Sequence, residues 1–228
     1  MTEDRPALRA LLVDDHQLLA QSLALALGME GVSCVVADLS DRDALVADVR
    51  SDPPDLVLLD LELGGAIGDG STLVEPFVES GCRVLVVSAS GDRELVGRAL
   101  EQGAVGMVRK SVAFAVLLDT ALAAVRGEQV MAPAERHCLL ADLRAERTRR
   151  AKATAPFTRL TDREAQVLRE LGQGSSVAAI AAEWVVSEAT VRSQVRGVLT
   201  KLGVSSPLEA VALAHRSGWW DGRPDLGR

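Results

Sequence analysis

The sequence predicts two domains, an α/β doubly wound domain with a five-stranded parallel sheet and, after it, an all-α domain. The chain has 228 residues, which is enough for two hydrophobic cores. In its first half, short apolar runs alternate with amphipathic stretches, a pattern typical of parallel βα units. From Leu160 onward, helical patterns follow one another without a strand pattern between them. We therefore expect domains over residues 1–127 and 158–228, joined by a partly helical basic linker over residues 128–157.

The composition favours a globular protein of a reducing compartment. Hydrophobic residues make up 48% of the chain, and no apolar run approaches the roughly 20 residues that a membrane span needs. The charged N-terminus lacks the apolar stretch of a secretory signal. The chain has three cysteines, at positions Cys34, Cys82 and Cys138. Their odd number and wide spacing argue against a set of disulfides or a metal cluster. We therefore expect a cytoplasmic protein without membrane contact.

Charge is divided unevenly along the chain. The net charge is −7, but acidic residues outnumber basic ones only in residues 1–127, whereas residues 128–228 carry an excess of basic residues. An acidic half joined to a mildly basic half indicates that a polyanionic partner would bind the second half.

The elements of the first domain alternate regularly between strand and helix. Short apolar runs predict strands at Ala10–Val13, Val32–Ala37, Leu56–Leu59, Val84–Val87 and Gly106–Val108. The amphipathic stretches between and after them predict helices near Leu18–Leu27, Asp41–Val49, Leu73–Glu79, Arg93–Gln102 and Val116–Arg126. Ligands of such sheets bind at the carboxyl ends of the strands, so functional residues are expected there.

The second half contains only helical signals. Pro133 can begin a helix that runs to about Lys152 and ends in a basic, partly mobile segment. Thr161-Asp162-Arg163-Glu164 is a capping box that begins a helix to Leu171. Serine N-caps and glycine or proline breaks then predict helices over Ser176–Trp184, Ser187–Leu202 and Pro207 to about Ser217.

Five residues at four predicted strand ends share one edge of the sheet. Asp14 and Asp15 follow the first strand, Asp60 the third, Ser88 the fourth and Lys110 the fifth. Three crowded carboxylates repel one another, and a hard cation with oxygen ligands, such as Mg²⁺, relieves that repulsion. Asp60 can then attack a phosphoryl group whose charge the metal and Lys110 offset, and the Ser88 hydroxyl can donate a hydrogen bond to the product.

Residues 8–127 resemble the receiver domains of bacterial two-component response regulators, which have a flavodoxin-like fold. The resemblance is carried by Leu12-Val13-Asp14-Asp15-His16, Leu58-Leu59-Asp60, Val87-Ser88-Ala89 and Lys110. It implies that Asp60 is the phosphoacceptor, that Asp14 and Asp15 bind Mg²⁺ with Asp60, and that the backbone carbonyl of Glu62 is the remaining protein ligand. We expect His16 to be a helix-entry side chain without a catalytic role.

Two features depart from the pattern of this family. Met107 stands three residues before Lys110, where receivers usually carry an aromatic ring whose rotation reports phosphorylation. Methionine fills space flexibly and has no ring to lock. The loop after Asp60 lacks the usual proline and contains four glycines within residues 61–70, so we expect it to be unusually mobile.

The predicted helix Ser187–Leu202 has one apolar and one polar side. Its apolar stripe consists of Val191, Val195, Val198 and Leu202. The polar side offers cations and hydroxyl groups, the side chains with which a recognition helix reads the major groove of DNA. The residues expected to contact double-stranded DNA are Thr190, Arg192, Ser193, Arg196, Thr200 and Lys201.

Residues 160–218 resemble the LuxR-type helix-turn-helix, so the whole chain resembles a response regulator of the NarL/FixJ type. The matching residues are Leu160-Thr161-Asp162-Arg163-Glu164, Ile180-Ala181, Val186-Ser187, Thr190-Val191-Arg192 and Lys201-Leu202-Gly203-Val204. The resemblance implies a homodimeric transcription factor that a sensor histidine kinase or a small phosphodonor phosphorylates on Asp60.

Three other interpretations remain open. Met107 and the glycine-rich loop favour control by a small ligand or a protein partner within the same architecture. A phosphatase that turns over an aspartyl phosphate, of the haloacid dehalogenase type, would need a second aspartate where Glu62 stands and a cap domain, so we expect no enzyme. A pure interaction module would have no use for Arg192 and Arg196.

Overall fold

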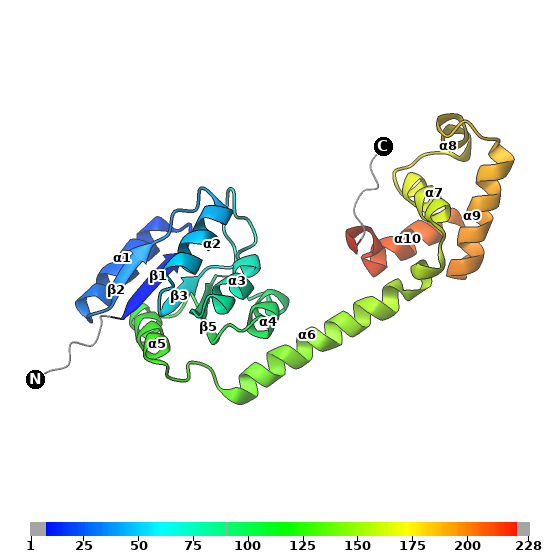
Figure 1. The fold of residues 1–228 in the computed structure, drawn as a ribbon. Helices are drawn as coiled ribbons and strands as arrows, with labels where there is room; N and C mark the ends of the chain where they lie inside the picture. The colour runs from blue at the N-terminus through cyan, green and yellow to red at the C-terminus, as the bar shows by residue number, and fades with distance from the viewer. Residues whose placement is uncertain (1–7, 90, 223–228) are drawn as a thin grey trace, which may run out of the picture. The chain divides into compact units, whose positions relative to one another are not determined.

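The structure of the chain is a computed structural model that describes residues 8–89 and 91–222 (Figure 1). It divides into two compact units, Met1–Arg144 and Ala145–Arg228. The first unit is an α/β unit and the second is helical throughout its described part. The expected fold class is therefore confirmed.

The first unit is built on a parallel sheet with the strand order β2-β1-β3-β4-β5. The strands are β1 (Arg9–Val13), β2 (Ser33–Val36), β3 (Leu56–Leu59), β4 (Arg83–Ser88) and β5 (Gly106–Arg109). The first five helices are α1 (Gln17–Met29), α2 (Arg42–Ser51), α3 (Val74–Glu79), α4 (Arg93–Glu101) and α5 (Phe114–Arg126). A 3-10 turn, η1 (Gly70–Leu73), leads into α3.

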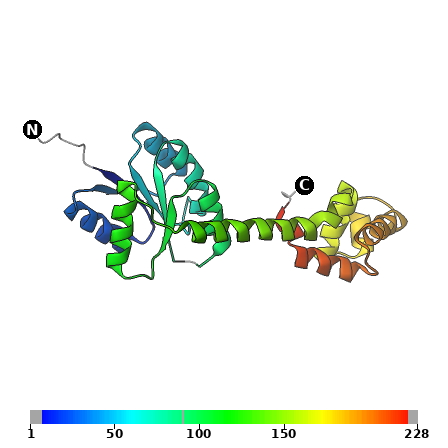
Figure 2. The same ribbon diagram turned by 90° about the horizontal axis from the view of Figure 1, so that it is seen from below.

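Helices cover both faces of this sheet (Figures 1 and 2). Successive side chains of a strand point to opposite faces, so the fully buried run of β3 serves two separate cores. Val57 and Leu59 pack with side chains of α2, α3 and α4, whereas Leu56 and Leu58 pack with side chains of α1 and α5. The continuous apolar runs of the inner strands follow from this double burial.

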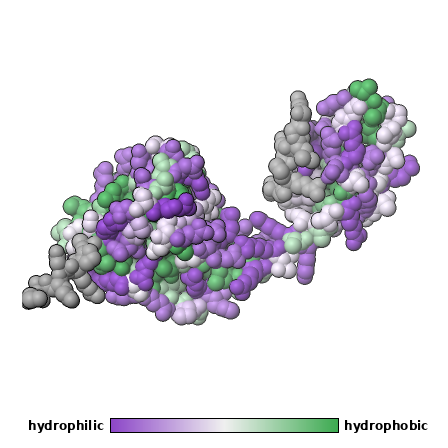
Figure 3. All heavy atoms as spheres, in the orientation of Figure 1, coloured by the Kyte–Doolittle hydropathy of each residue, from purple (hydrophilic) through white to green (hydrophobic). Residues whose placement is uncertain are grey.

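Helix α6 (Pro133–Thr154) begins in the first unit and ends in the second. Leu139 packs in the same core as side chains of α4, and Leu143 is buried beside Gly97 of α4. Gly97 makes room for them, because a Cβ at that position would lie 3.2 Å from the Cβ atom of Leu143. The rest of the visible surface of α6 is mostly hydrophilic (Figure 3).

Polar contacts fix the start of α6 on α4. The Arg136 guanidinium donates to the carbonyl oxygens of Leu100, in the last turn of α4, and of Ala104, just beyond the helix, at 2.8 and 2.7 Å. Arg93 pairs with Asp142 across the same contact, at 3.0 Å from Nε to Oδ2. The expected linker is thus largely one helix, and its first half packs on the first unit.

The second unit contains four helices within its described residues, besides the end of α6. They are α7 (Asp162–Gly172), α8 (Val177–Glu183), α9 (Glu188–Leu202) and α10 (Pro207–Ser217), with 3-10 turns η2 (Ala155–Arg159) and η3 (Trp219–Gly222). The predicted capping box of Thr161 and Glu164 is present. Of the helices that the structure describes, none is long and apolar enough to cross a membrane.

The turn between α8 and α9 contains a strained residue. Val185 has a φ of 54° and is 90% exposed. A β-branched side chain at positive φ is strained by about 1–3 kcal/mol, and here no burial of the side chain offsets the cost.

We predict that Val185→Gly raises the free energy of unfolding of the second unit by about 1 kcal/mol, because glycine adopts positive φ without strain. Denaturant unfolding of the full chain measures the change. Val116→Gly is the matched control: Val116 is exposed within α5, where glycine should destabilise. A loss of stability in Val185→Gly would show that the turn carries no relievable strain.

Candidate functional site

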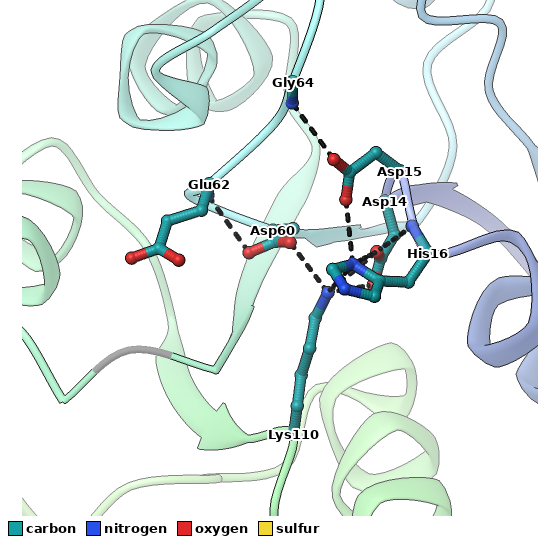
Figure 4. A network of polar contacts seen from close by, with 7 residues as sticks. All are labelled: Asp14, Asp15, His16, Asp60, Glu62, Gly64 and Lys110. Atoms are coloured by element: carbon teal, nitrogen blue, oxygen red, sulfur yellow. Dashed lines mark hydrogen bonds and ion pairs between the residues drawn. The ribbon is translucent and has the colours of Figure 1, made fainter.

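The acid pocket lies at the carboxyl edge of the sheet, where β1, β3 and β5 end (Figure 4). Asp14 and Asp60 are only 6% and 2% exposed. The Lys110 ammonium lies between them, with Nζ 2.7 Å from Oδ2 of each carboxylate. Three strands that are far apart in sequence therefore bring together one cation and two buried anions.

Backbone hydrogen bonds position this trio. The Asp60 N–H donates to the Val13 carbonyl at 2.9 Å, and the Lys110 N–H donates to the Ser88 carbonyl at 2.9 Å. Burial acts to lower the pKa of Lys110, but its hydrogen bonds to Asp14 and Asp60 outweigh this and raise the pKa above its usual value. The ammonium is therefore held in its charged form.

Asp15 completes the carboxylate set from the more exposed side of the pocket. Its Oδ2 accepts a hydrogen bond from the Gly64 N–H at 3.1 Å, and its Oδ1 lies 2.8 Å from His16 Nδ1. Burial acts to raise the pKa of Asp15, but the Gly64 N–H and His16 lower it below the usual value. Asp15 is therefore ionised at neutral pH and available to a cation.

Ser88 and Glu62 flank the pocket in different ways. Ser88 is buried as the last residue of β4 and lies beside Arg109 in the sheet register. The backbone N–H of Glu62 donates to Asp60 Oδ1 at 3.1 Å, while its side chain is exposed. The roles expected for the Ser88 hydroxyl and the Glu62 carbonyl stay predictions.

The side chain of His16 lies in the pocket, a position that the sequence did not predict. It is the N-cap residue of α1, but its side chain makes no capping hydrogen bond. Its Nδ1 atom instead lies 3.3 Å from Asp14 Oδ1 and 3.3 Å from Lys110 Nζ (Figure 4). The only sequence signal for this position is that His16 directly follows Asp14 and Asp15. The same sequence position is equally compatible with a side chain that only begins α1.

The donor set of the pocket fits a divalent cation. Asp14, Asp15, His16 and Asp60 offer ligand atoms that all lie within 4.8 Å of one another. The Lys110 ammonium lies between two of the carboxylates, whose negative charges stabilise a positive charge at this position. Carboxylate oxygens are the ligands that Mg²⁺ prefers.

The loop after Asp60 packs against the first unit through several buried side chains, although it contains four glycines. Leu61, Leu63 and Ile67 are buried, and Glu62 pairs with Asp69 in an isolated antiparallel bridge. Gly70 passes so close to the Asp60 backbone that a Cβ there would clash with the Asp60 carbonyl oxygen. The mobility expected of this loop stays a prediction.

Met107 borders a small cavity. It is partly buried on β5 and, with residues of α4 and α6, lines a cavity of about 230 Å³. Val96 and Leu139 give this cavity apolar walls, and Arg93 and Cys138 lie at its polar side. The residue at the usual switch position is therefore next to the helix that leads to the second unit.

A second candidate site is the polar side of α9. The apolar stripe is buried as expected, and five of the six residues expected to contact DNA are exposed. They are Thr190, Arg192, Ser193, Arg196 and Thr200. Arg192 forms an ion pair with Glu188 at 2.8 Å, one turn earlier on the same helix, whereas no ion pair of Arg196 is found among the described residues.

Lys201, the sixth of these residues, is only partly exposed. Its ammonium pairs with the carboxylate of Glu164, which also accepts the Thr161 N–H of the capping box. Burial acts to raise the pKa of Glu164, but Lys201 and Thr161 lower it below the usual value. Lys201 therefore joins α9 to α7, because a buried carboxylate needs a cationic partner. The contact with DNA expected of Lys201 stays a prediction.

Comparisons with known proteins identify a family for each unit. Residues 10–122 match the family described as "Response regulator receiver domain", and residues 158–214 match "Bacterial regulatory proteins, luxR family". The "Probable transcriptional regulatory protein NarL" of Mycobacterium tuberculosis is 34% identical over 208 residues, which are 91% of this chain and 94% of that protein. The "Nitrate/nitrite response regulator protein NarL" of Escherichia coli K12 is 32% identical over 218 residues, 95% and 98% of the two chains.

Solved structures include relatives of similar length. Full-length FixJ from B. japonicum is 26% identical and covers 92% of this chain and 97% of its own, with a TM-score of 0.44. The assignment therefore depends on the sequence matches, which span both units at more than 30% identity. The chain belongs to the NarL-type response regulators, transcriptional regulators that join a receiver domain to a LuxR-type DNA-binding domain.

Proposed function

We propose that this response regulator works in the cytoplasm, accepts a phosphoryl group on Asp60 and in consequence changes its binding to promoter DNA through α9. The observation that supports the phosphoacceptor most directly is the buried pair of Asp60 and Asp14 with one ammonium between them. Such an arrangement neutralises only part of the local negative charge. It is suited to take up a divalent cation and then a phosphoryl group.

The chemistry proposed for the pocket is one phosphoryl transfer. An oxygen of the Asp60 carboxylate attacks the phosphorus atom of a sensor histidine kinase or a small phosphodonor, and the bond from phosphorus to the donor breaks. Mg²⁺ held by Asp14, Asp15, Asp60 and the Glu62 carbonyl, when bound, offsets the charge of the phosphoryl oxygens. Lys110 exchanges its contact with Asp60 for one with a transferred oxygen.

The proposed product is a state of the protein, not a released compound. The Ser88 hydroxyl donates to the acyl phosphate and draws the segment between β4 and α4 toward the pocket. Because α6 packs on α4 through Leu139, Leu143 and Arg136, a shift of α4 moves the start of the helix that enters the second unit. We propose this contact as the route of control, so the phosphoryl group serves as a signal and not for enzymatic turnover.

A second mode of control is supported by the cavity beside Met107. Its volume of about 230 Å³ could hold a small ligand against α4 and α6. Under this alternative, DNA binding does not respond to a phosphodonor. A Met107→Trp substitution, which fills the cavity, would then change DNA affinity in the unphosphorylated protein.

We propose that α9 enters the major groove with Arg196 as its principal cation. The guanidinium of Arg196 has no ion-pair partner among the described residues, whereas Arg192 has to leave Glu188 before it binds DNA. Exposed cations beside exposed hydroxyl groups suit contacts to phosphates and to guanine edges.

We predict that incubation with acetyl phosphate and Mg²⁺ adds one phosphoryl group to the wild type and none to Asp60→Asn, because the asparagine amide lacks the nucleophilic carboxylate oxygen. Chelation of Mg²⁺ should abolish the addition. Intact-mass spectrometry measures it, and Asp119→Asn, at an exposed position of α5, is the matched control. Equal labelling of wild type and Asp60→Asn, or of neither, would contradict the assignment.

We predict that phosphorylation shifts the chain only weakly toward the expected homodimer. Met107 has no ring that locks into one rotamer, so the two states of the receiver differ little in free energy. Light scattering before and after labelling checks this. Complete conversion from monomer to dimer would show that another element transmits the signal.

We predict that Arg196→Ala weakens DNA binding by about 1–3 kcal/mol if the side chain reads a base. If it contacts only phosphate, all DNA sequences should bind more weakly by a similar factor. The slope of the logarithm of the binding constant against the logarithm of the salt concentration should then fall by about one unit. Arg192→Ala should cost less, because wild-type Arg192 must first give up its Glu188 partner. Fluorescence anisotropy at several salt concentrations measures both.

The control for this series is Arg216→Ala, which removes an exposed arginine from the end of α10. All three substitutions should leave folding stability within about 0.5 kcal/mol of wild type, because each lies on the surface. Unchanged DNA affinity in the doubly substituted Arg192→Ala, Arg196→Ala protein would show that α9 does not enter the groove.

A further inference from the structure

The imidazole of His16 is turned into the acid pocket, although the proposed phosphoryl transfer makes no use of it. Its Nδ1 atom lies 2.8 Å from Asp15 Oδ1 and 3.3 Å from Asp14 Oδ1. The backbone N–H of His16 donates to Asp14 Oδ1 at 2.8 Å, which fixes the start of α1 without help from the ring. The orientation of the ring is therefore not explained by helix capping.

A cationic group already lies among these atoms. The Lys110 ammonium is 2.7 Å from carboxylate oxygens of both Asp14 and Asp60, and 3.3 Å from His16 Nδ1 (Figure 4). In one tautomer Nδ1 donates to the Asp15 carboxylate 2.8 Å away, and in the other, with the proton on Nε2, it offers a lone pair to a cation. Two carboxylates and one imidazole nitrogen thus surround a positive charge from three sides.

The imidazole nitrogen in this donor set is not a ligand that Mg²⁺ prefers. Mg²⁺ takes carboxylate oxygens and water, whereas imidazole nitrogen favours later first-row cations such as Co²⁺, Ni²⁺ and Zn²⁺. The side chain of His16 is 65% exposed and that of Asp15 is 36% exposed. Solvent therefore reaches the pocket on this side and can supply the remaining ligands.

We propose that the acid pocket is a mixed oxygen and nitrogen site, in which His16 Nδ1 is an additional ligand for a late first-row divalent cation. Asp14, Asp15 and Asp60 supply the oxygen ligands that the same pocket offers to Mg²⁺. The inference depends on the metal site of the proposed function, but it does not depend on phosphorylation. It makes His16 the residue that sets which divalent cation the receiver prefers.

Calorimetric titration of the full chain with Co²⁺ and, separately, with Mg²⁺ at one pH tests the proposal. In His16→Ala the dissociation constant for Co²⁺ should rise at least about tenfold, because even outer-shell partners of a metal contribute about 10–100-fold. The dissociation constant for Mg²⁺ should stay within about twofold of wild type, because Mg²⁺ gains little from imidazole. The visible absorption of bound Co²⁺ should change with the loss of the nitrogen ligand.

Matched variants separate a ligand from a structural role. His137→Ala removes an exposed histidine of α6 and should leave both affinities unchanged. His16→Asn keeps a residue that is favoured at helix N-termini and should lose Co²⁺ affinity as His16→Ala does.

Two results would overturn the proposal: an unchanged Co²⁺ affinity in both His16 variants, or equal changes for Co²⁺ and Mg²⁺. These titrations contain no phosphodonor. A negative result for His16 is therefore distinguishable from a negative result for the phosphorylation of Asp60 with Mg²⁺.

Discussion

The ion pairs of Lys110 with Asp14 and Asp60 constrain the whole receiver. They join the ends of β1, β3 and β5 through side chains that are almost fully buried. Removing either carboxylate leaves the buried Lys110 ammonium with only one neighbouring negative charge. Removing the lysine leaves two buried carboxylates close together without a cation between them. The apolar strands can therefore end in charged residues only because all three charges meet at one point of the sheet edge.

The same edge leads to the second unit through α4 and α6. The pocket is connected to the linker helix through α4. Strand β4 ends at Ser88 in the pocket, α4 follows β4, and the first half of α6 packs on α4. Arg136 bonds to carbonyl oxygens at the end of α4, so the contact involves backbone groups as well as apolar side chains. Under the proposed route of control, the signal passes through this packed contact and does not depend on one rotamer of Met107.

Most of the fold was predictable because its signals are local. The β3 run is apolar throughout since both faces of the sheet are covered, and the valines of α9 recur at helical spacing since one side of that helix is buried. The strand ends then placed Asp14, Asp60 and Lys110 at one edge by topology alone. These inferences needed only the period of each element and the rule for parallel sheets.

The features that were missed depend on contacts between distant residues. Lys201 pairs with Glu164 of another helix, a contact that its position on α9 could not reveal. The docking of α6 depends on Gly97, whose missing side chain admits Leu143. His16 has the same sequence position whether its ring points into the pocket or into solvent, so only the structure separates the two.

The central claim is that chemistry at Asp60 controls DNA binding by the second unit. Gel shift of the full chain on the DNA upstream of its own coding sequence, with and without acetyl phosphate and Mg²⁺, tests it most directly. We expect the affinity of the wild type to change only when both are present, and the affinity of Asp60→Asn to be the same under all conditions. Identical binding by the wild type in every condition, or an equal response in Asp60→Asn, would contradict the claim.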